Sequence, residues 1–521
     1  MKRETWNSKI GVILAVSGSA IGLGNFLRFP GKAVDNGGGA FMIPYFISFL
    51  LVGIPMCWAE WAMGRAGGKY GHNSASGIFE TLIRKPYAKY FGVLCIIIPL
   101  IIYMYYIYIE AWCLGYAWFF LTGILDLGTE PSKYAAFFEN FVGMSQNGSI
   151  FSKAGLAAIF FLGFSYIVNF ILIYRGVQKG IEKFCKIAMP LLMICSIIIL
   201  VRVLTLGTPD STLPEQNVLN GLGFMWNPKW IMLKSGKVWM EAAGQIFFSI
   251  SVGFGLILTY SSYLKKNADV ALSGLTACAT NEFAEVILAG LMIIPAAFIF
   301  LGAAPLENLH GSTLGLGFYT LPVVFGHMGP VAGRIFGFLF FFLLFLAAIT
   351  SSISMLQPAI AFIEQGFGVT RRAATVALGF ITGIGALAVI YLTKNLAALD
   401  IMDFWAGTAF IFIMATLMVI FFGWFFGAEK GVREVNRGAA IKVPAIFAFI
   451  LKYVTPLYLI TIFLLWIKTS AGDYIKKSFK NPDVIVTMAG MGLLIIFVTL
   501  MVNLAGKRWN KYGIGLKEVD E

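Results

Sequence analysis

The chain has 521 residues, of which 59% are hydrophobic and 12% charged, and its mean hydropathy is +0.81. Soluble proteins carry about a quarter charged residues, so this composition excludes a soluble globular protein and indicates a polytopic membrane protein. The net charge of +13 could suit a nucleic-acid-binding protein, but the basic residues lie in alternate short loops and not on one face. That distribution is typical of membrane proteins with basic cytoplasmic loops.

A helix needs about 20 apolar residues to cross the hydrocarbon layer of a membrane. The sequence predicts twelve such spans, at residues 10–34, 39–64, 88–123, 155–174, 183–203, 239–263, 270–302, 331–366, 373–392, 400–427, 444–467 and 484–505. Lys and Arg gather in the connections that follow even-numbered spans, whereas residues 303–330 contain neither. Both termini are therefore predicted to be cytoplasmic, although the outer connection 468–480 is an exception with four lysines. The apolar connection 303–330 is expected to pack back onto the protein as a lid.

The first span is interrupted by small and polar residues. Its stretch "AVSGSAIGLGNFLRFP", residues 15–30, holds three glycines, an asparagine and an arginine. Unpaired backbone at membrane depth is tolerated only where it is buried in protein or lines a cavity. A break here would turn free carbonyl groups of one half-helix and free N–H groups of the other toward one place. Such a place offers acceptors for a cation and donors for an anion.

The sixth span has a similar interruption, in which Ser249, Ser251, Gly253 and Gly255 break an apolar run. Gly and Ser in membrane helices often serve only close packing, and for a single segment this alternative would be preferred. Two interruptions five spans apart, each beside polar residues, instead indicate an inverted-repeat transporter with its binding site near the membrane midplane.

The spans contain further polar residues. They are Asn25 and Arg28 in the first span, Glu60 in the second, Glu110 in the third, Asn281 and Glu285 in the seventh, Thr350, Ser351 and Ser352 in the eighth, and Asp403 in the tenth. Ionisable ones are costly in a membrane and indicate function, whereas Ser and Thr are weaker evidence because an isolated hydroxyl more often bonds a carbonyl of its own helix. A site of hydroxyls, amides and carbonyls without His or Cys suits a hard ion such as Na⁺. The six cysteines lie in or beside apolar runs without metal-ligand spacing and are predicted to be buried.

Several long motifs in these segments resemble the bacterial branch of the neurotransmitter:sodium symporter family. They are "GSAIGLGNFLRFP", "NGGGAFMIPYF", "GIPMCWAEWAMGR", "KGIEKFCKIAMP", "GQIFFSISVGFG", "NEFAEVI", "TSSISMLQP" and "MDFWAGT". The resemblance covers nearly the whole chain. It implies two inverted five-helix repeats with helices 1 and 6 broken, followed by two C-terminal helices. The implied division places helices 1–6 in residues 1–264, helices 7–10 in 265–430, and helices 11–12 with a cytoplasmic tail in 431–521 of one membrane domain.

The resemblance implies a sodium-coupled symporter in the plasma membrane of a bacterium, importing a neutral hydrophobic L-amino acid by alternating access. It implies two Na⁺ sites and no organic cofactor. The first site would use the Ala20 carbonyl, the Asn25 and Asn281 side chains and both oxygens of Ser249, with the substrate carboxylate. The second would use the Gly18, Ile21 and Ala347 carbonyls and the Thr350 and Ser351 hydroxyls.

The substrate site that the resemblance implies lies between the two breaks. The substrate carboxylate would meet the Leu23 and Gly24 N–H groups and the Tyr106 hydroxyl. The ammonium group would meet the Ala20, Phe248 and Ser249 carbonyls and the Ser251 hydroxyl. The substrate side chain would contact Ile102, Tyr106, Phe248, Phe254, Ser351 and Met355.

Two gates follow from the same resemblance. Arg28 and Asp403 would close the outside through water, with Tyr106 and Phe254 as a thin lid over the substrate.

On the cytoplasmic side Arg3 and Trp6 match the family's latch, but the acidic partner falls on Gln365 in this chain. Glu364 is adjacent, yet one residue along a helix points about 100° away. The inner latch is therefore expected either to be weaker or to use another acceptor for Arg3.

Glu285 stands where chloride-dependent relatives have a small polar residue, and the resemblance implies that its carboxylate replaces the anion. Chloride-independent transport is expected, with proton counter-movement through Glu285 left open. The alternative is a buried Glu285 that pairs with a neighbour for stability.

Other classes of membrane protein fit the sequence less well. A channel needs rings of like groups around a pore, which the chain does not show. A membrane enzyme needs a nucleophile–base or metal constellation, but the three histidines lie in no motif. A transport-deficient amino-acid sensor on the same fold stays an alternative, and a homodimer is an open possibility.

Overall fold

The computed structural model describes residues 6–153, 155–303, 313–468 and 479–515. This part of the chain is built of helices, and its only β-type pairing is an isolated bridge between Gly38 and Pro228. Ten helical stretches are long and apolar enough to cross a membrane, and one bent pair raises the number to eleven. The prediction of an all-α polytopic membrane protein is confirmed.

The ten continuous stretches match ten of the predicted spans. They are Gly39–Gly68 (α3 and α4), Ala88–Thr122 (with α6, Leu94–Thr122), Leu156–Tyr174 (α8), Val177–Leu204 (with α9, Lys183–Leu204), Val270–Leu301 (α13 and α14), Pro330–Phe367 (α18), Arg371–Tyr391 (α19), Lys394–Val435 (α20 to α22), Ile446–Trp466 (α23 and α24) and Pro482–Tyr512 (α26). Shorter helices lie in the connections: Ala75–Ile83 (α5), Pro131–Phe141 (α7) and Val218–Trp226 (α10).

The first predicted span is a bent pair of helices. Helix α1 (Lys9–Ala20) begins after Ser8, whose hydroxyl accepts a hydrogen bond from the Gly11 N–H group at 3.0 Å. The chain leaves the helix after Ala20 and resumes with a π-helical turn, Gly24–Arg28, followed by α2 (Phe29–Asp35). The two halves are bent by 45°, which confirms the predicted break.

The sixth predicted span is also broken, into α11 (Gly236–Ser249) and α12 (Leu256–Ser262). The backbone between them enters the left-handed region at Ser251 (φ 55°), Gly253 (φ 81°) and Gly255 (φ 77°). Glycine adopts this conformation readily, and a Cβ at Gly255 would lie only 2.5 Å from the Cβ of Cys95. The glycines of the motif therefore permit both the turn and its close approach to α6.

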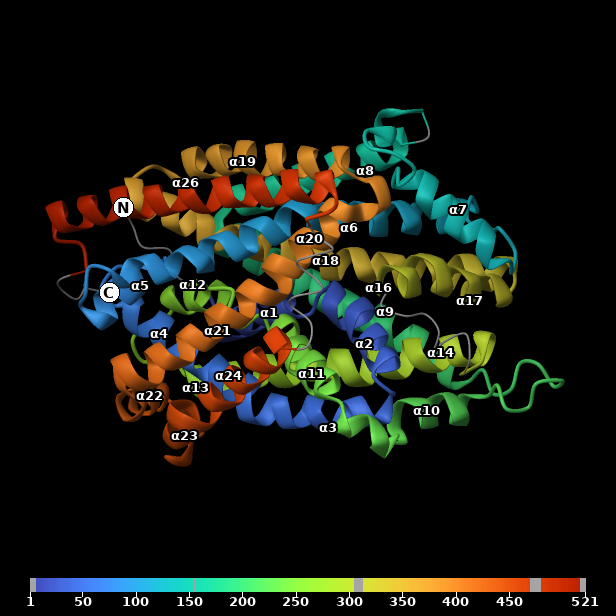
Figure 1. Cartoon of the computed structure of the whole chain (residues 1–521), viewed down its shortest axis with the longest axis horizontal. Helices are drawn as coiled ribbons and strands as arrows, with labels where there is room; N and C mark the ends of the chain where they lie inside the picture. The colour runs from blue at the N-terminus through green and yellow to red at the C-terminus, as the bar shows by residue number, and fades with distance from the viewer. Residues whose placement is uncertain (1–5, 154, 304–312, 469–478, 516–521) are drawn as a thin grey trace.

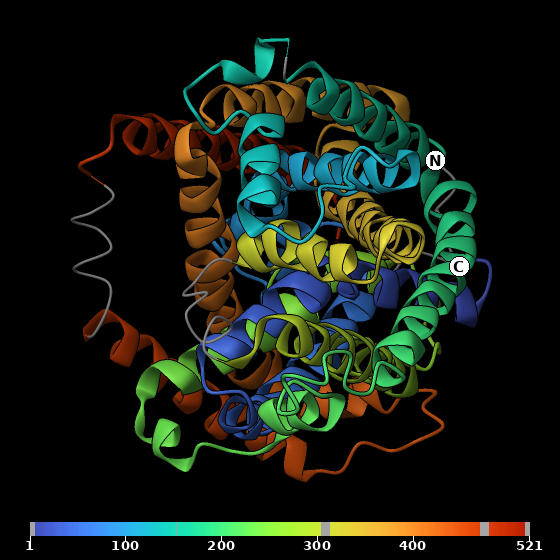
Figure 2. The same cartoon turned by 90° about the vertical axis from the view of Figure 1, so that its right-hand side faces the viewer.

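Helices α6 and α18 pack against each other in the interior, and α18 also contacts α1, α9 and α12. Most of the long helices run along the longest axis of the molecule (Figure 1). In the end-on view α18 (yellow) lies inside and α26 (dark red) at the edge (Figure 2). Accordingly, 94% of the apolar window of Ala88–Thr122 is buried, against 17% for Pro482–Tyr512. Of the broken helices, α1 and α12 are buried over most of their length.

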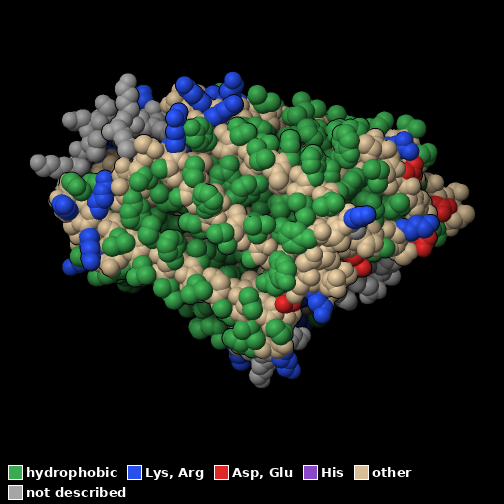
Figure 3. All heavy atoms as spheres, turned by 90° about the horizontal axis from the view of Figure 1, so that it is seen from above, with side chains coloured by type: hydrophobic (Ala, Val, Ile, Leu, Met, Phe, Trp, Pro, Cys, Tyr) green, Lys and Arg blue, Asp and Glu red, His purple; other side chains and the backbone are tan. Residues whose placement is uncertain are grey.

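Hydrophobic side chains cover much of the long face seen from above, whereas most charged side chains lie toward its two ends, with a further basic group at the lower tip (Figure 3). Acidic side chains in this view appear only on the half away from the chain termini, where basic ones accompany them (Figures 1 and 3). The six cysteines are buried and free, as predicted. An apolar belt between charged ends is the surface that a lipid bilayer requires.

The described part of the connection 303–330 that follows residue 312 packs onto the protein, as predicted. It forms α16 (Thr313–Gly315), a π-helical turn (Leu316–Thr320) and α17 (Leu321–His327). These segments contact α7, α18 and the second half of the first span.

Candidate functional site

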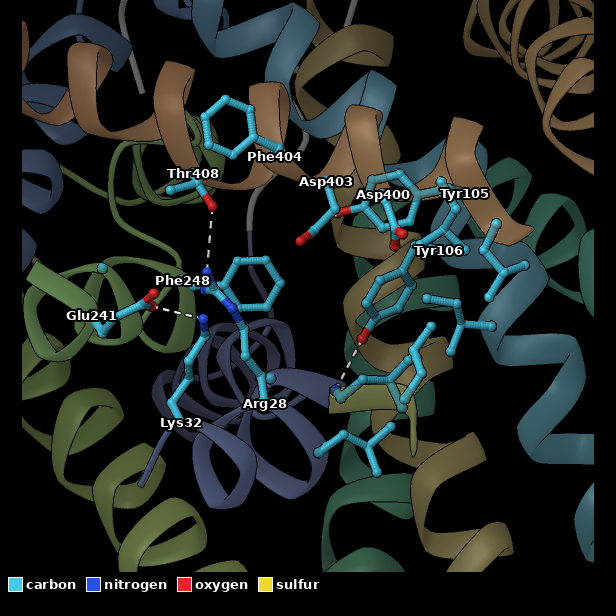
Figure 4. A pocket seen from close by; sticks show the side chains of 18 of the residues that line it. Arg28, Lys32, Tyr105, Tyr106, Glu241, Phe248, Asp400, Asp403, Phe404 and Thr408 are labelled. Carbon is cyan, nitrogen blue, oxygen red and sulfur yellow. Dashed lines mark hydrogen bonds and ion pairs between the residues drawn. The ribbon is translucent and has the colours of Figure 1, made fainter. Parts of the chain in front are cut away.

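A cavity of about 520 Å³ opens beside the break in the first span (Figure 4). The break, α6, α11 and α20 (Ala397–Phe404) supply its walls. The lining includes Leu23, Gly24, Arg28, Lys32, Tyr105, Tyr106, Glu241, Phe248, Asp400 and Asp403. It therefore joins predicted substrate residues to predicted residues of the outer gate.

The predicted side-chain ligands of the first Na⁺ site meet in one buried cluster. The Asn25 amide donates to Asn281 Oδ1 at 2.9 Å and to Glu285 Oε2 at 3.0 Å, and its Oδ1 accepts from the Gly22 N–H group at 2.8 Å. The Asn281 amide donates to Ser249 Oγ at 2.6 Å. Buried amide and hydroxyl oxygens suit Na⁺, so this donor set fits the ion that the fold implies.

Glu285 closes this cluster on one side. Its Oε1 accepts from Gln245 Nε2 at 2.7 Å, and its Oε2 accepts from Ser249 Oγ as well as from Asn25. In the described part of the chain its hydrogen-bond partners are all neutral. Glu285 thus bonds the candidate Na⁺ ligands and not a basic side chain. Gln245 was not predicted, although it stands in the motif "GQIFFSISVGFG".

The predicted residues of the second Na⁺ site also lie together, where α18 crosses the end of α1. Ser351 Oγ lies 3.4 Å from the Gly18 carbonyl oxygen and 3.2 Å from that of Ser19. Thr350 directly precedes Ser351 on α18, and its Oγ1 lies 3.1 Å from the carbonyl oxygen of Ala347, about one turn earlier. The Ser19 carbonyl was not predicted, because a backbone oxygen leaves no signal in the sequence.

The free backbone of the first break faces two aromatic side chains. The Leu23 N–H group donates to the Tyr106 hydroxyl at 3.1 Å. A Cβ at Gly22 would lie 2.9 Å from the same hydroxyl, and a Cβ at Gly24 would lie 2.7 Å from Phe248 Cδ1. Glycine at both positions therefore keeps the N–H groups and the two rings close together.

The remaining predicted substrate and Na⁺ residues are buried around the two breaks. The Ser251 hydroxyl donates to the Ser19 carbonyl at 3.3 Å, which joins the second break to the first. The others are Ala20, Ile21, Ile102, Phe254 and Met355, which are 7%, 0%, 0%, 2% and 5% exposed.

The predicted outer gate pair, Arg28 and Asp403, lies on two sides of the cavity (Figure 4). The Arg28 guanidinium donates to Thr408 Oγ1 at 3.4 Å and lies 4.5 Å from the centre of the Phe248 ring. Asp403 Oδ1 accepts from the Tyr105 hydroxyl at 2.7 Å. Both gate residues lie in the described part of the chain, where no direct hydrogen bond or ion pair joins them and each has other partners.

The two predicted lid residues, Tyr106 and Phe254, differ in their position relative to the cavity. Tyr106 lines the cavity together with Phe248, whereas Phe254 is absent from its lining. The rings of Phe248 and Phe254 are 6.1 Å apart, and Phe248 is the one nearer the opening and under the Arg28 guanidinium. Phe248 is still part of α11, whereas Phe254 lies within the break, before α12 begins at Leu256.

Trp6, a predicted residue of the inner latch, contacts Tyr260 of α12. Its indole N–H group donates to the Tyr260 carbonyl at 3.0 Å, and the two rings meet edge to face at 5.3 Å. Arg3, the other predicted residue of the inner latch, lies outside the described residues. Glu364 forms an ion pair with Arg371 at 3.6 Å.

Gln365 holds the loop between α4 (Ile54–Gly68) and α5. Its amide donates to the Gly71 carbonyl at 2.5 Å and lies 2.8 Å from His72 Nδ1, and its oxygen accepts from the Asn73 N–H group at 3.2 Å. Burial lowers the pKa of His72 to about 4, so a neutral imidazole can accept the Gln365 hydrogen bond. The residue that replaces the family's acidic latch thus has structural partners of its own.

Comparison with known proteins agrees with this geometry. The family model described as "Sodium:neurotransmitter symporter family" matches residues 3–130 and 125–509. An uncharacterized sodium-dependent transporter of Methanocaldococcus jannaschii is 32% identical over 468 residues, which cover 89% of this chain and 90% of the relative. Another, of Haemophilus influenzae, is 30% identical over 477 residues, which cover 89% and 98%.

The fold matches the crystal structure of MhsT in complex with L-phenylalanine. The TM-score is 0.76 and the identity 30%, over 89% of this chain and 99% of that chain. Because the family consists of secondary transporters, the protein is a sodium-dependent membrane transporter and not an enzyme. With its family model matched over almost the full length and its two helix breaks in place, this chain belongs to the sodium:neurotransmitter symporter family.

Proposed function

We propose that the protein is a symporter that couples the inward movement of Na⁺ to uptake of a neutral, hydrophobic L-amino acid, in a bacterial plasma membrane with both termini cytoplasmic. One observation carries the proposal. The clustered side chains of Asn25, Ser249 and Asn281 lie beside the Leu23 N–H group, which points at the Tyr106 hydroxyl. A cation site and an anion site therefore adjoin at the broken helices.

Two Na⁺ ions would bind in these positions. The first would lie among Ala20, Asn25, Ser249 and Asn281, and the second among Gly18, Ile21, Ala347, Thr350 and Ser351. If the substrate carboxylate completes the first site, each ligand raises the affinity for the other by the same factor. This reciprocal effect is the physical basis of coupling.

The chemistry around the breaks favours an amino acid over a monoamine. The proposed partners of the amine are backbone carbonyls and the Ser251 hydroxyl, with no carboxylate among them. The substrate therefore has to supply its own negative charge. Ile102, Phe248, Phe254 and Met355 would surround an apolar side chain, and the neighbouring fold of MhsT was solved with L-phenylalanine.

Alternating access would begin from the open cavity. Arg28 Nη1 is buried and makes no hydrogen bond within the described residues, so it has a free donor for a partner that arrives on closure. Asp403 would supply that partner as α20 approaches. At the other end the Trp6–Tyr260 contact would have to open for release.

The test of this function is uptake of radiolabelled leucine or phenylalanine into proteoliposomes with an inward Na⁺ gradient. Uptake that needs the gradient supports a symporter. Na⁺-dependent binding without uptake would instead support the amino-acid sensor. A competition panel of the twenty amino acids against one bound label, with and without Na⁺, would then define the substrate.

Replacing chloride with gluconate is expected to leave the initial uptake rate unchanged, because the Glu285 carboxylate supplies the negative charge beside the first Na⁺ site. The matched variant Glu285→Ser removes that charge and should make uptake depend on chloride. Loss of wild-type uptake in gluconate would contradict the proposal that the Glu285 carboxylate replaces chloride.

Arg3→Ala is expected to lower uptake by no more than about fivefold, because Gln365 stands at the position of the family's acidic partner and carries no charge, and a surface ion pair contributes about 1 kcal/mol or less. Trp6→Ala is the comparison, since it removes the indole that bonds Tyr260 and should reduce uptake more strongly. Complete loss of proteoliposome uptake in Arg3→Ala would show that the inner latch keeps its full strength here.

A further inference from the structure

Three buried polar side chains from three helices form a closed ring outside the sites described above. Glu110 lies on α6, Asn169 on α8 and Ser352 on α18, and each is 0% exposed. The Asn169 amide donates to Glu110 Oε1 at 2.8 Å. Ser352 Oγ lies 2.6 Å from Glu110 Oε2 and 2.6 Å from Asn169 Oδ1.

The hydrogens of this ring can be counted. The second N–H of the Asn169 amide donates to the Ser165 carbonyl at 2.9 Å, which fixes the amide's orientation because a flipped amide would turn its oxygen toward that carbonyl. Ser352 has one hydroxyl hydrogen but two oxygens at 2.6 Å, in addition to the Ile349 carbonyl at 3.2 Å. With Glu110 ionised, one of the two short oxygen–oxygen contacts would contain no hydrogen.

A proton on Glu110 Oε2 supplies the hydrogen that this contact lacks. Glu110 then donates to Ser352, Ser352 donates to Asn169, and Asn169 donates to Glu110. Every short contact has one donor and one acceptor, as buried polar groups require.

The surroundings also favour a neutral carboxyl. Within the described residues no Lys, Arg or His side chain pairs with Glu110. The titratable groups close to it are Tyr103, Tyr106 and Cys113 on the same helix, and Tyr166 of α8 faces Tyr103. A buried carboxylate without a cation is strongly disfavoured at membrane depth.

The ring is next to the proposed second Na⁺ site without being part of it. Ser352 directly follows the hydroxyl residues Thr350 and Ser351 on α18. Glu110 lies one helical turn beyond Tyr106 on α6. The ring therefore ties the segment of α18 that would bind Na⁺ to the segment of α6 that would bind the substrate carboxylate.

We propose that Glu110 holds a proton in this conformation, and that the neutral ring of Glu110, Asn169 and Ser352 positions α18 for Na⁺ binding. This inference rests on the proposed function, since it assigns a positioning residue to the second Na⁺ site. Removal of the proton would leave two oxygens facing each other, open the ring and loosen the contact between α6 and α18. Na⁺ binding would weaken as a result.

Glu110→Gln and Glu110→Ala distinguish the proton from the side chain. The Gln amide can donate to Ser352 while its carbonyl accepts from Asn169, so Glu110→Gln mimics the protonated acid. Glu110→Ala leaves Ser352 and Asn169 without their partner. Ser165→Ala is the matched control, because the Ser165 hydroxyl lies beside the ring and makes no hydrogen bond within the described residues.

The first measurement is the infrared difference spectrum between the wild-type full chain and Glu110→Gln in lipid nanodiscs. We expect the wild type to show a protonated carboxylic-acid carbonyl band that the variant lacks. If the band that Glu110→Gln lacks is instead that of an ionised carboxylate, the proton assignment is overturned. This measurement does not depend on transport, so it decides the protonation state even if the protein moves no amino acid.

The second measurement is a Na⁺ titration of labelled amino-acid binding. Half-saturating Na⁺ should stay within about threefold of the wild type in Glu110→Gln and Ser165→Ala, and rise at least about tenfold in Glu110→Ala, as expected when buried partners lose a hydrogen bond. Equal damage in Glu110→Gln and Glu110→Ala would overturn the positioning role of a neutral carboxyl. If Glu110→Ala does not fold, Glu110→Gln still decides the question. If Glu110 were ionised in the wild type, its replacement by a neutral amide would weaken Na⁺ binding. Wild-type protein without any Na⁺-dependent binding would contradict the proposed function itself and the positioning role with it.

Discussion

Asn25→Ala is expected to raise half-saturating Na⁺ at least about 100-fold in a binding assay with labelled amino acid. The side chain accepts from the Gly22 N–H group and donates to Asn281 and Glu285. Its removal leaves buried partners unpaired at about 1–3 kcal/mol each, and 100-fold corresponds to about 2.8 kcal/mol. It also deletes a proposed Na⁺ ligand and releases the backbone at the break.

The matched control is Asn36→Ala. Asn36 is also a buried asparagine, and its amide donates to the Lys32 carbonyl at 2.9 Å just past the end of α2, away from the cluster. We expect this variant to keep half-saturating Na⁺ within about threefold, because it removes one local hydrogen bond. Similar Na⁺ dependence in the two variants would show that Asn25 is not a ligand.

The two helix breaks could be predicted because they are local properties of the sequence. Glycines and serines in an apolar run mark where a helix stops, and the structure breaks the chain after Ala20 and after Ser249. The meeting of Asn25 with Asn281 was implied only by the resemblance. These residues are 256 positions apart, and no local pattern predicts such a contact.

The partners of the predicted outer-gate residues could not be predicted from the sequence. Arg28 and Asp403 are the same residues whether the gate is open or closed, so their presence does not indicate which partners they have. In the structure Asp403 accepts a hydrogen bond from Tyr105. Arg28 donates to Thr408 and lies over the Phe248 ring. Tyr105 and Thr408 were not predicted, because their roles depend on how α6 packs near residues 403–408.

The hydrogen-bond partners of Gln365 also could not be predicted from the sequence. The sequence showed that the acidic latch residue is missing, but it did not show what a glutamine would do in its place. An amide both donates and accepts, so Gln365 can bond a carbonyl, a neutral imidazole and a backbone N–H group of one loop at once. A carboxylate could only have accepted.

Tyr106→Phe is expected to weaken amino-acid binding about 30-fold at saturating Na⁺, which corresponds to the roughly 2 kcal/mol of a hydrogen bond to a charged group. The lost hydroxyl accepts from the Leu23 N–H group at 3.1 Å and is the proposed donor to the substrate carboxylate. The measurement is the dissociation constant of a labelled amino acid.

Tyr105→Phe is the matched control, one residue along the same helix. Its hydroxyl donates to Asp403 and does not reach the break, so its loss should leave the dissociation constant within about threefold. Because the two variants delete the same atom from adjacent residues, equal loss of affinity in both would mean that the substrate carboxylate does not bind at the break in the first helix.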